Sequence, residues 1–305
     1  MQIAILLGSF NGGFYIQEQL ESFVKQSHKD WILWASDDGS TDNTVDIVKN
    51  FALKIGAQRV HQVIGPKKGF AKNFLALVCN SDLNADAYAY ADQDDIWIAD
   101  KLERAVHFFK SVPASTPALY CSRTQYVDQL NSNIGLSLPY SKPAVFANAL
   151  IQNIASGNTM VFNEAARSLI VKAGDSVNID LHDWWTYMLV TGAGGKVLFD
   201  QEPSVRYRQH PNNLWGMNTS FKAQIMRIQK LFWGRFQDWN DRHTAALKPM
   251  QNLLTPENKN IYEQFAKARK QRLIPRMLGL KKSGVYRQTT LNNVGFFLAA
   301  LVGKV

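Results

Sequence analysis

Cysteine is scarce in this sequence of 305 residues, which contains Cys79 and Cys121 as its two examples. Both lie in apolar stretches, and their separation matches no usual spacing of zinc ligands, which argues against a thiolate metal site. We expect two buried free thiols, as is usual in a reducing cytosol. The predicted location is therefore cytoplasmic.

Long apolar runs are also lacking. The last one, Val294 to Val302, has nine residues, whereas a membrane-spanning helix needs about 20. The first, Met1 to Leu7, lacks the basic N-terminal region of a secretion signal and is too short for one, so we interpret it as a strand. The pattern is compatible with peripheral contact to a membrane and argues against a membrane span.

Positive charge is scarce in the first two thirds of the chain. Residues 1–200 contain 16 Lys and Arg against 20 Asp and Glu, a net charge of −4. Residues 201–305 contain 18 against 5, a net charge of +13, which gives the total of +9. The basic excess predicts an anionic partner for this end of the chain, such as membrane lipid, a pyrophosphate-linked acceptor or nucleic acid.

The strongest local signal is the segment 86–97, where alternating small and aromatic residues end in Asp92, Asp94 and Asp95. The alternation predicts a half-buried strand, and a helical pattern resumes at Ile98, so the acids follow a strand's carboxyl end. Three carboxylates this close repel one another unless a cation or hydrogen bonds lie among them. Oxygen ligands without cysteine favour Mg²⁺ or Mn²⁺ and a phosphate-bearing ligand. A solvated acidic turn at a helix start is the alternative.

Three strand-and-helix units precede this segment. Their predicted strands cover residues 2–9, 31–36 and 59–64, and an amphipathic helix follows each. This alternation predicts a parallel sheet with right-handed crossovers, an α/β fold. The turns after the first, second and fourth strands then meet at one edge, where ligands of open α/β sheets bind. The polar residues expected beside the acids are Ser9, Asn11, Asp37 and Asp38.

Two further positions carry chemistry of interest. Asp183 begins a predicted helix and is followed by Trp184 and Trp185. Capping is the simple interpretation of this carboxylate, but partial desolvation beside tryptophan also suits a general base, because it raises the pKa. His210 follows predicted strands at 196–199 and 205–207; a single histidine before a proline is usually structural.

The C-terminal region is predicted to be helical and basic from about Thr219 onward. Apolar residues recur at helical spacing from Phe221 to Phe232, and cations alternate with apolar residues through residues 265–288. A cationic amphipathic helix of this kind can lie on a membrane surface. A solvated basic face is the alternative.

With these motifs in view, the chain resembles the inverting glycosyltransferases of family two, which have the GT-A fold. Among them it is most similar to bacterial rhamnosyltransferases of cell-surface polysaccharide and lipopolysaccharide assembly. The motifs are Gly8–Gly12, Asp37–Asp42, Asp92–Trp97, Gly157–Thr159, His182–Trp184 and Tyr207–His210. The resemblance implies a mostly parallel, Rossmann-like catalytic domain in residues 1–215 and a basic helical region in residues 216–305.

The resemblance also implies a role for each matching position. Asp183 corresponds to the catalytic base, and the positions expected to hold Mg²⁺ or Mn²⁺ are Asp94, His210 and Asp92. The positions that correspond to nucleotide-sugar contacts are Ser9, Asn11, Asp38, Lys72, Asp92 and Gln93. Those assigned to the acceptor or the sugar are Asp95, Trp97, His182 and Trp184. The sequence departs from the family pattern at Gly8–Asn11, where a triplet of the Thr-Tyr-Asn type is usual.

The implied reaction moves L-rhamnose from dTDP-L-rhamnose to a hydroxyl of a lipopolysaccharide or polysaccharide acceptor, with inversion at the anomeric carbon. The cation stabilises the leaving diphosphate, and Asp183 removes the acceptor proton. The implied partners are the nucleotide sugar, a lipid-linked or lipopolysaccharide saccharide and an anionic membrane surface, with no nucleic acid. The implied location is the cytoplasm, at the inner face of the membrane.

Other functions stay open at this point. A family-two enzyme can use a UDP- or dTDP-hexose instead, because the rhamnose prediction depends on the resemblance alone. A nucleotidyltransferase with the same sheet usually has a basic residue in its first glycine-rich loop, and Gly8–Gly13 contains no Lys or Arg. A non-catalytic module that binds carbohydrate or membrane is the third interpretation.

Overall fold

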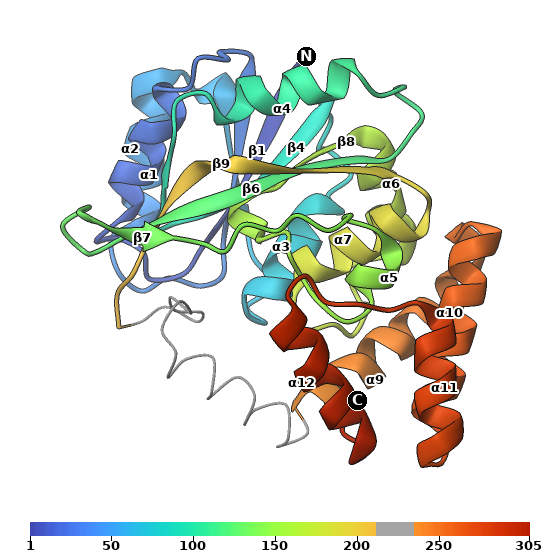
Figure 1. The fold of residues 1–305 in the computed structure, drawn as a ribbon. Helices are drawn as coiled ribbons and strands as arrows, with labels where there is room; N and C mark the ends of the chain where they lie inside the picture. Colours follow the sequence, from blue (N-terminus) through green and yellow to red (C-terminus); the bar gives the residue numbers. More distant parts are fainter. Residues whose placement is uncertain (212–234) are drawn as a thin grey trace.

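The computed structural model describes residues 1–211 and 235–305 (Figure 1). The apolar periodicity from Phe221 to Phe232 and the domain boundary expected at residues 215 and 216 lie outside the described residues. The described part forms a curled central sheet flanked by helices, with further helices at the C-terminal end (Figure 1). This confirms the α/β class expected from the alternating pattern.

Four parallel strands form one half of the sheet. In space they run β3 (Val60–Ile64), β2 (Trp31–Asp37), β1 (Ile3–Ser9) and β4 (Ala87–Asp92). The crossovers are α1 (Ile16–Val24), α2 (Thr44–Ile55) and α3 (Phe70–Val78), and a 3₁₀ turn (Ala57–Arg59) precedes β3. The register sets Ser9 opposite Asp37 and Gly8 opposite Asp92. The polar turns after β1, β2 and β4 therefore meet at one edge, as expected.

The other half of the sheet is mixed. It contains β8 (Val161–Asn163), β6 (Ala118–Val127), β9 (Lys196–Arg208) and β5 (Ile96–Trp97), with β7 (Asn133–Leu136) paired to β6. The pairs β4–β8, β6–β8, β6–β7 and β5–β9 are antiparallel, and β6–β9 is parallel. The strands expected at 196–199 and 205–207 are one strand, β9, because a register shift opposite Ser122 and Thr124 absorbs the residues between them.

The apolar pattern of residues 154–162 predicts a strand interrupted by a bend at its glycine. A 3₁₀ turn, Gly157–Thr159, occupies its middle, and β8 begins at Val161. The short strand β5 lies between the acids and α4 (Lys101–Lys110), where the sequence showed no strand signal. Two-residue strands carry too short a pattern to be detected by periodicity.

Helices cover both faces of the sheet. The apolar side chains on one face of β1 and β4, Ile5 and Ala89 for example, pack under α1, α2 and α4. Those on the other face, such as Leu6 and Tyr90, pack under α3, α6 (Glu164–Ala173), α7 (His182–Gly192) and α5 (Phe146–Ala149). Alternate residues of a strand point to opposite faces, which explains the two clusters.

The C-terminal helices share the second of these cores. They are α9 (Arg235–Leu247), a 3₁₀ segment (Lys248–Leu253), α10 (Pro256–Arg269), α11 (Leu273–Ser283) and α12 (Thr290–Leu301). Their buried side chains, Phe265 and Phe296 among them, belong to the cluster under α5 and α7. The side-chain amide of Asn258 donates to the carbonyls of Thr191 and Gly192 at 3.0 Å each, fixing α10 to the end of α7. No helix within the described ranges is both long and apolar enough to cross a bilayer.

Candidate functional site

A hollow of about 390 Å³ lies at the carboxyl ends of the first three parallel strands. Its lining residues are Ser9, Ala35, Asp37, Gly39, Ser40, Val45, Val48, Lys49, Gln62, Val63, Ile64 and Lys67. The Asp37 carboxylate accepts hydrogen bonds from the hydroxyls of Ser9 at 3.0 Å and Ser40 at 2.5 Å. Aliphatic walls with a few oriented polar groups can take a nucleobase and ribose.

Asn11 and Asp38 order the loops around this hollow. The side-chain oxygen of Asn11 accepts from the Thr41 backbone N–H at 2.9 Å, with Asn11 itself at φ +48°. The Asp38 carboxylate accepts from the backbone N–H groups of Lys67 at 2.6 Å and Gly69 at 2.8 Å. The turns after β1, β2 and β3 are therefore tied together by these two side chains.

The loop after β4 is joined to the loop after β1 by Gln93. Its side-chain amide accepts from the Phe10 backbone N–H at 2.8 Å and donates to the Phe10 carbonyl at 2.9 Å. This pair of hydrogen bonds across 83 positions fixes the start of the acidic loop against the hollow. Sequence neighbours of Asp94 are thus held close to the nucleotide-sized space.

Asp94 contacts His210, with 2.8 Å between the carboxylate Oδ2 and Nε2. The Arg208 side chain, 2% exposed, lies beneath this pair and donates to the carbonyls of Asp94 at 3.1 Å and Gln129 at 2.9 Å. It also forms an ion pair with Glu18. The Tyr15 ring stacks on His210 at 4.9 Å between ring centroids. The acidic loop and the end of β9 are therefore bound to each other by several contacts.

The Asp94 and His210 pair could bind a divalent cation whose other ligands come from phosphate oxygens and water. Mg²⁺ usually binds through one or two protein carboxylates, with phosphate oxygens and water completing its octahedron. In residues 1–211 and 235–305, no three His, Cys, Asp or Glu side chains converge closely enough to hold a metal ion. A carboxylate and an imidazole so placed could supply two ligands of such a cation.

Behind the pair, Asp95 and Lys101 are completely buried. The Asp95 carboxylate accepts from the Asn158 side-chain amide at 2.6 Å, and the Lys101 ammonium donates to the Asn158 carbonyl at 2.5 Å. Lys101 also lies 3.4 Å from the centroid of the Trp97 ring. Burial and the neighbouring acids raise the pKa of Asp95, and burial lowers the pKa of Lys101. Against burial, the charges of Asp95 and Asp92 raise the pKa of Lys101, and Lys101 in turn lowers the pKa of Asp92.

Asp183 lies in the first turn of α7, where helix N–H groups favour negative charge. Its carboxylate accepts from the backbone N–H groups of Gly157 at 3.0 Å and Trp184 at 2.6 Å. Burial outweighs these bonds and raises its pKa from 3.8 to about 6. The pKa of Asp92 is also raised, by burial first and then by the charges of Asp94 and Asp183. Asp94 and Asp183 therefore act electrostatically on the same carboxyl group.

Gly157 sets how closely the 3₁₀ turn approaches α7. A Cβ at this position would lie 3.0 Å from Nε2 of His182 and 3.2 Å from Cβ of Asp183. The His182 ring cannot yield easily, because it stacks on Phe74 at 4.1 Å and meets Tyr90 edge-on at 4.6 Å. A side chain larger than hydrogen at Gly157 would displace Asp183.

The four positions that the resemblance assigned to the acceptor or the sugar are all buried. They are Asp95, Trp97, His182 and Trp184. Burial lowers the pKa of His182 to about 3, and the indole N–H of Trp184 donates to the Ala149 carbonyl at 2.6 Å. Lys72 donates to the carbonyls of Asp175 at 3.0 Å and Val177 at 2.7 Å. Four of these five side chains are therefore buried, and those of Lys72 and Trp184 are bound to backbone carbonyls.

Several residues that organise the site have no assigned role in the sequence prediction, although Ser40, Asn158 and Arg208 lie within its motifs. The residues without an assigned role are Glu18, Ser40, Lys49, Lys67, Lys101, Asn158 and Arg208. Lys101 stands at an apolar-facing position of a helix, which is an unusual place for a charge and was a usable signal. Arg208 pairs with Glu18 across 190 positions, and no local pattern reports such a contact.

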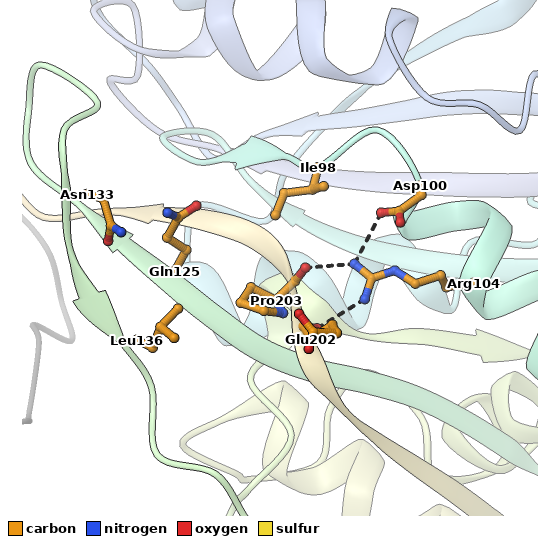
Figure 2. A pocket seen from close by; sticks show the side chains of 8 residues that line it. All are labelled: Ile98, Asp100, Arg104, Gln125, Asn133, Leu136, Glu202 and Pro203. Atoms are coloured by element: carbon orange, nitrogen blue, oxygen red, sulfur yellow. Dashed lines mark hydrogen bonds and ion pairs between the residues drawn. The ribbon is translucent and has the colours of Figure 1, made fainter.

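A second hollow, of about 550 Å³, lies on another part of the surface (Figure 2). Its lining residues are Ile98, Asp100, Arg104, Gln125, Asn133, Leu136, Glu202 and Pro203. The Arg104 guanidinium is already bound to Asp100 at 3.2 Å and to the Pro203 carbonyl at 2.7 Å (Figure 2). This hollow contains none of the predicted site residues, and its cation is not available to an anionic ligand.

The sequence matches the model of glycosyl transferase family 2 over residues 5–169. It is 30% identical to the dTDP-rhamnosyl transferase RfbG of Shigella flexneri over 73% of this chain and 78% of that protein. It is also 29% identical to the UDP-Glc:alpha-D-GlcNAc-diphosphoundecaprenol beta-1,3-glucosyltransferase WfgD of Escherichia coli, over 34% of this chain and 39% of that protein.

Solved structures resemble the fold over most of the chain. S. aureus TarS 1-349 in complex with UDP-GlcNAc has a TM-score of 0.54 at 13% identity, over 94% of this chain and 93% of that one. The mannosyltransferase PcManGT from Pyrobaculum calidifontis, in complex with GDP-Man and Mn²⁺, has a TM-score of 0.51 at 14% identity, over 99% and 85%. At these identities the likeness establishes the fold alone, the predicted GT-A fold. With the family model covering more than half of its length, the chain belongs to glycosyl transferase family 2.

Proposed function

We propose that the chain is an inverting, metal-dependent transferase that moves L-rhamnose from dTDP-L-rhamnose to a hydroxyl of a lipopolysaccharide or polysaccharide acceptor. The observation that supports the reaction type is the Asp183 carboxyl, whose pKa is raised to about 6 by burial. Its charge and that of Asp94 both raise the pKa of Asp92. The observation that favours rhamnose is the similarity to the Shigella dTDP-rhamnosyl transferase over 73% of the chain.

In this proposal the hollow beside Asp37 takes the base and ribose of the donor. Ser9 contributes to its wall directly, while Asn11 and Asp38 act by holding its loops. Gln93 fixes the acidic loop against it, so the diphosphate would extend from the hollow toward Asp94. The contacts within the protein thus favour one direction for the donor.

Asp94 and His210 would hold the cation, with Asp92 beside them. A bound Mg²⁺ or Mn²⁺ supplies positive charge where the leaving diphosphate becomes more negative. Arg208 keeps Asp94 and the end of β9 in place, and its guanidinium is engaged by Glu18 and by backbone carbonyls. Lys101 balances the buried Asp95 behind the pair.

Asp183 is the proposed base. As the acceptor oxygen forms its bond to the anomeric carbon, the proton of its hydroxyl passes to the Asp183 carboxylate, and the bond from that carbon to the diphosphate oxygen breaks. Direct displacement inverts the anomeric carbon, so a β-linked donor gives an α-linked rhamnoside. A base with a pKa of about 6 is ionised at neutral pH and still accepts a proton in the transition state.

The buried positions have a supporting role in this scheme. We propose that His182 and Trp184 act on the acceptor side by fixing the first turn of α7, and that Trp97 and Asp95 act by fixing the acidic loop. Lys72 would act through the loop that precedes α7. The proposed partners are a nucleotide-sugar donor and a lipid-linked or lipopolysaccharide saccharide.

A donor panel tests the proposal. Purified protein is incubated with dTDP-L-rhamnose, dTDP-glucose, UDP-glucose and UDP-GlcNAc in the presence of Mn²⁺ or Mg²⁺, and thermal shift and release of nucleoside diphosphate are measured. We expect the largest shift and the fastest release with dTDP-L-rhamnose, and loss of both when the metal is chelated. A clear preference for a UDP-hexose would overturn the rhamnose assignment and leave the transferase assignment in place.

A UDP-hexose donor is the second candidate. It is favoured by the similarity to the E. coli glucosyltransferase, whose name specifies UDP-Glc as its donor. That similarity covers about a third of the chain, less than half of what the Shigella relative covers. For this reason we propose dTDP-L-rhamnose as the donor.

A further inference from the structure

Exposed apolar side chains gather at the C-terminal end of the molecule. Of the 20 large apolar residues that are exposed in the described part, eight lie on α11 and α12 or directly after α12. These are Leu273, Ile274, Leu278, Leu291, Val294, Leu298, Leu301 and Val302. Single exposed apolar residues are normal, but a concentration of this kind marks an interaction surface.

On α11 the exposed residues form one face. Ile274, 72% exposed, and Leu278, 65% exposed, are four positions apart, and Lys282 follows after four more. Residues at this spacing lie above one another on a helix. Leu273 and Lys281 flank the row. The opposite side of the helix is anchored by Leu280, which is buried. The outward face is thus apolar along its length and basic at its end.

On α12 the four exposed residues also share one face, because they are three, four and three positions apart from Leu291 to Leu301, as the helical repeat requires. Val302 follows directly after the helix. Its other face, with Phe296 and Ala300, is buried in the core. The Arg276 guanidinium of α11 donates to the Ala300 carbonyl of α12 at 2.9 Å. The two helices are therefore fixed to each other and to the core, and lie at the end of the molecule away from the N-terminus (Figure 1).

The charged side chains of the segment that carries this surface have one sign. After Glu263 the chain contains no further Asp or Glu, and its cations lie at positions 267, 269, 270, 272, 276, 281, 282, 287 and 304. Lys270, Arg272, Lys281 and Lys282 are exposed, and the described residues provide no ion pair for them. An apolar face bordered by uncompensated cations complements a surface that has an apolar interior and anionic head groups.

We propose that the exposed face of α11 and α12 binds the surface of an anionic lipid bilayer, with the apolar side chains in the interface and the lysines at the head groups. The inference concerns where the enzyme works and not which sugar it transfers, so its failure and that of the proposed function are distinguishable. Lipid is favoured over a protein partner because the cations border the apolar side chains and extend over both ends of α11.

Point variants test the surface better than deletion. Residues 265–305 also supply core side chains such as Phe265 and Phe296, so their removal would expose the apolar core that they cover. The variants are Ile274→Asp with Leu278→Asp, which breaks the apolar face, and Lys281→Glu with Lys282→Glu, which reverses its charge. The matched control is Leu53→Asp, which changes a similarly exposed leucine on α2.

Binding is measured by co-sedimentation with vesicles of phosphatidylcholine alone and with phosphatidylglycerol added. We expect wild type and Leu53→Asp to bind the anionic vesicles, and each double variant to bind at least about fivefold more weakly. The Tm measured without any ligand should match that of wild type in both double variants, which shows that they are folded.

Three results would overturn the inference. The first is that the wild type does not bind anionic vesicles. The second is that the double variants bind them as strongly as the wild type does, and the third is that the wild type binds neutral and anionic vesicles equally. Sedimentation velocity identifies the main competing occupant: a wild-type dimer that Ile274→Asp with Leu278→Asp makes monomeric, without vesicle binding, would assign the face to a second copy of the chain.

Discussion

At the residue scale, Asp183 combines two opposing influences. Burial disfavours its charge, while the N–H groups of Gly157 and Trp184 and the side chain of Asn153 favour it. Burial is the larger effect, so the carboxyl is a better proton acceptor than a solvated aspartate. In the proposed reaction the residue is thereby suited to take a proton from a sugar hydroxyl while the hydroxyl oxygen bonds to the anomeric carbon.

Replacing Asp183 by Asn should abolish most transfer while leaving the donor bound. The amide has nearly the same shape but cannot take the acceptor proton, and general-base catalysis typically contributes about 100- to 10,000-fold to a rate. We expect kcat to fall at least about 100-fold, with the donor Kd within a factor of about two of wild type. Stopped assays for kcat and isothermal titration for Kd would check this; unchanged transfer would remove Asp183 from the base role.

The pH dependence follows from the same carboxyl. The pKa of Asp183 is raised from 3.8 to about 6, and the ionised form is the active base, so kcat/KM should rise with pH through about 6 and then level off. The free energy of unfolding should change in the opposite direction, falling as pH rises. The folded chain binds this proton more tightly than the unfolded chain does, so the stability that comes from the protonated acid is lost as pH rises through about 6.

Two measurements check this prediction. The pH profile of kcat/KM should lose its limb near pH 6 in Asp183→Asn, measured on the residual activity. The difference in Tm between the variant and wild type should change in favour of the variant as the buffer moves from about pH 5 to about pH 8. A limb that persists in the variant would assign it to another group.

At the scale of elements, β9 connects the acidic loop to the rest of the sheet. It pairs with β5 directly after the acids and with β6 along most of its length. Its last residue, Arg208, donates to the carbonyl of Asp94 and binds the carboxylate of Glu18 on α1. A strand that is distant in sequence therefore holds the proposed metal pair in position.

Arg208→Lys should loosen this connection. A single ammonium cannot reach the Glu18 carboxylate and the carbonyls of Asp94 and Gln129 together, and leaving buried groups unsatisfied costs about 1–3 kcal/mol each. We expect a lower Tm and donor binding that is at least about tenfold weaker with Mn²⁺ or Mg²⁺. Calorimetry would measure both. Arg206→Lys, an exposed position on the same strand, is the control and should change neither. Wild-type donor affinity in Arg208→Lys would refute the proposed role.

At the scale of the whole molecule, the C-terminal helices and the catalytic sheet share one core. Trp184 of α7 meets Trp239 and His243 of α9 at ring distances of 5.7 and 4.5 Å. The backbone N–H of Thr255 donates to the Gly192 carbonyl at 3.0 Å, and Leu254 packs over Gly192. The helix whose first turn holds Asp183 is thus covered by the chain's last third.

We therefore expect one cooperative unfolding transition for the full chain. Leu254→Ala should lower the free energy of unfolding by about 2–4 kcal/mol, because it removes packing from the junction between α7 and the C-terminal helices. Differential scanning calorimetry should show a single peak that moves to lower temperature as a whole. A peak that splits, with the catalytic part unaffected, would show two independently stable units.

What the sequence determined by itself is the arrangement of the parallel strands and the edge at which their polar turns meet. Period-two and helical patterns are local, and parallel pairing with right-handed crossovers leaves few topologies, so local patterns alone suffice to place Ser9, Asp37 and Asp92 together. What only the tertiary structure decided is which charges meet and which are buried. Lys101 under the acids, Arg208 between α1 and β9, and the burial of His182 depend on contacts between distant segments, and a sequence window does not record them.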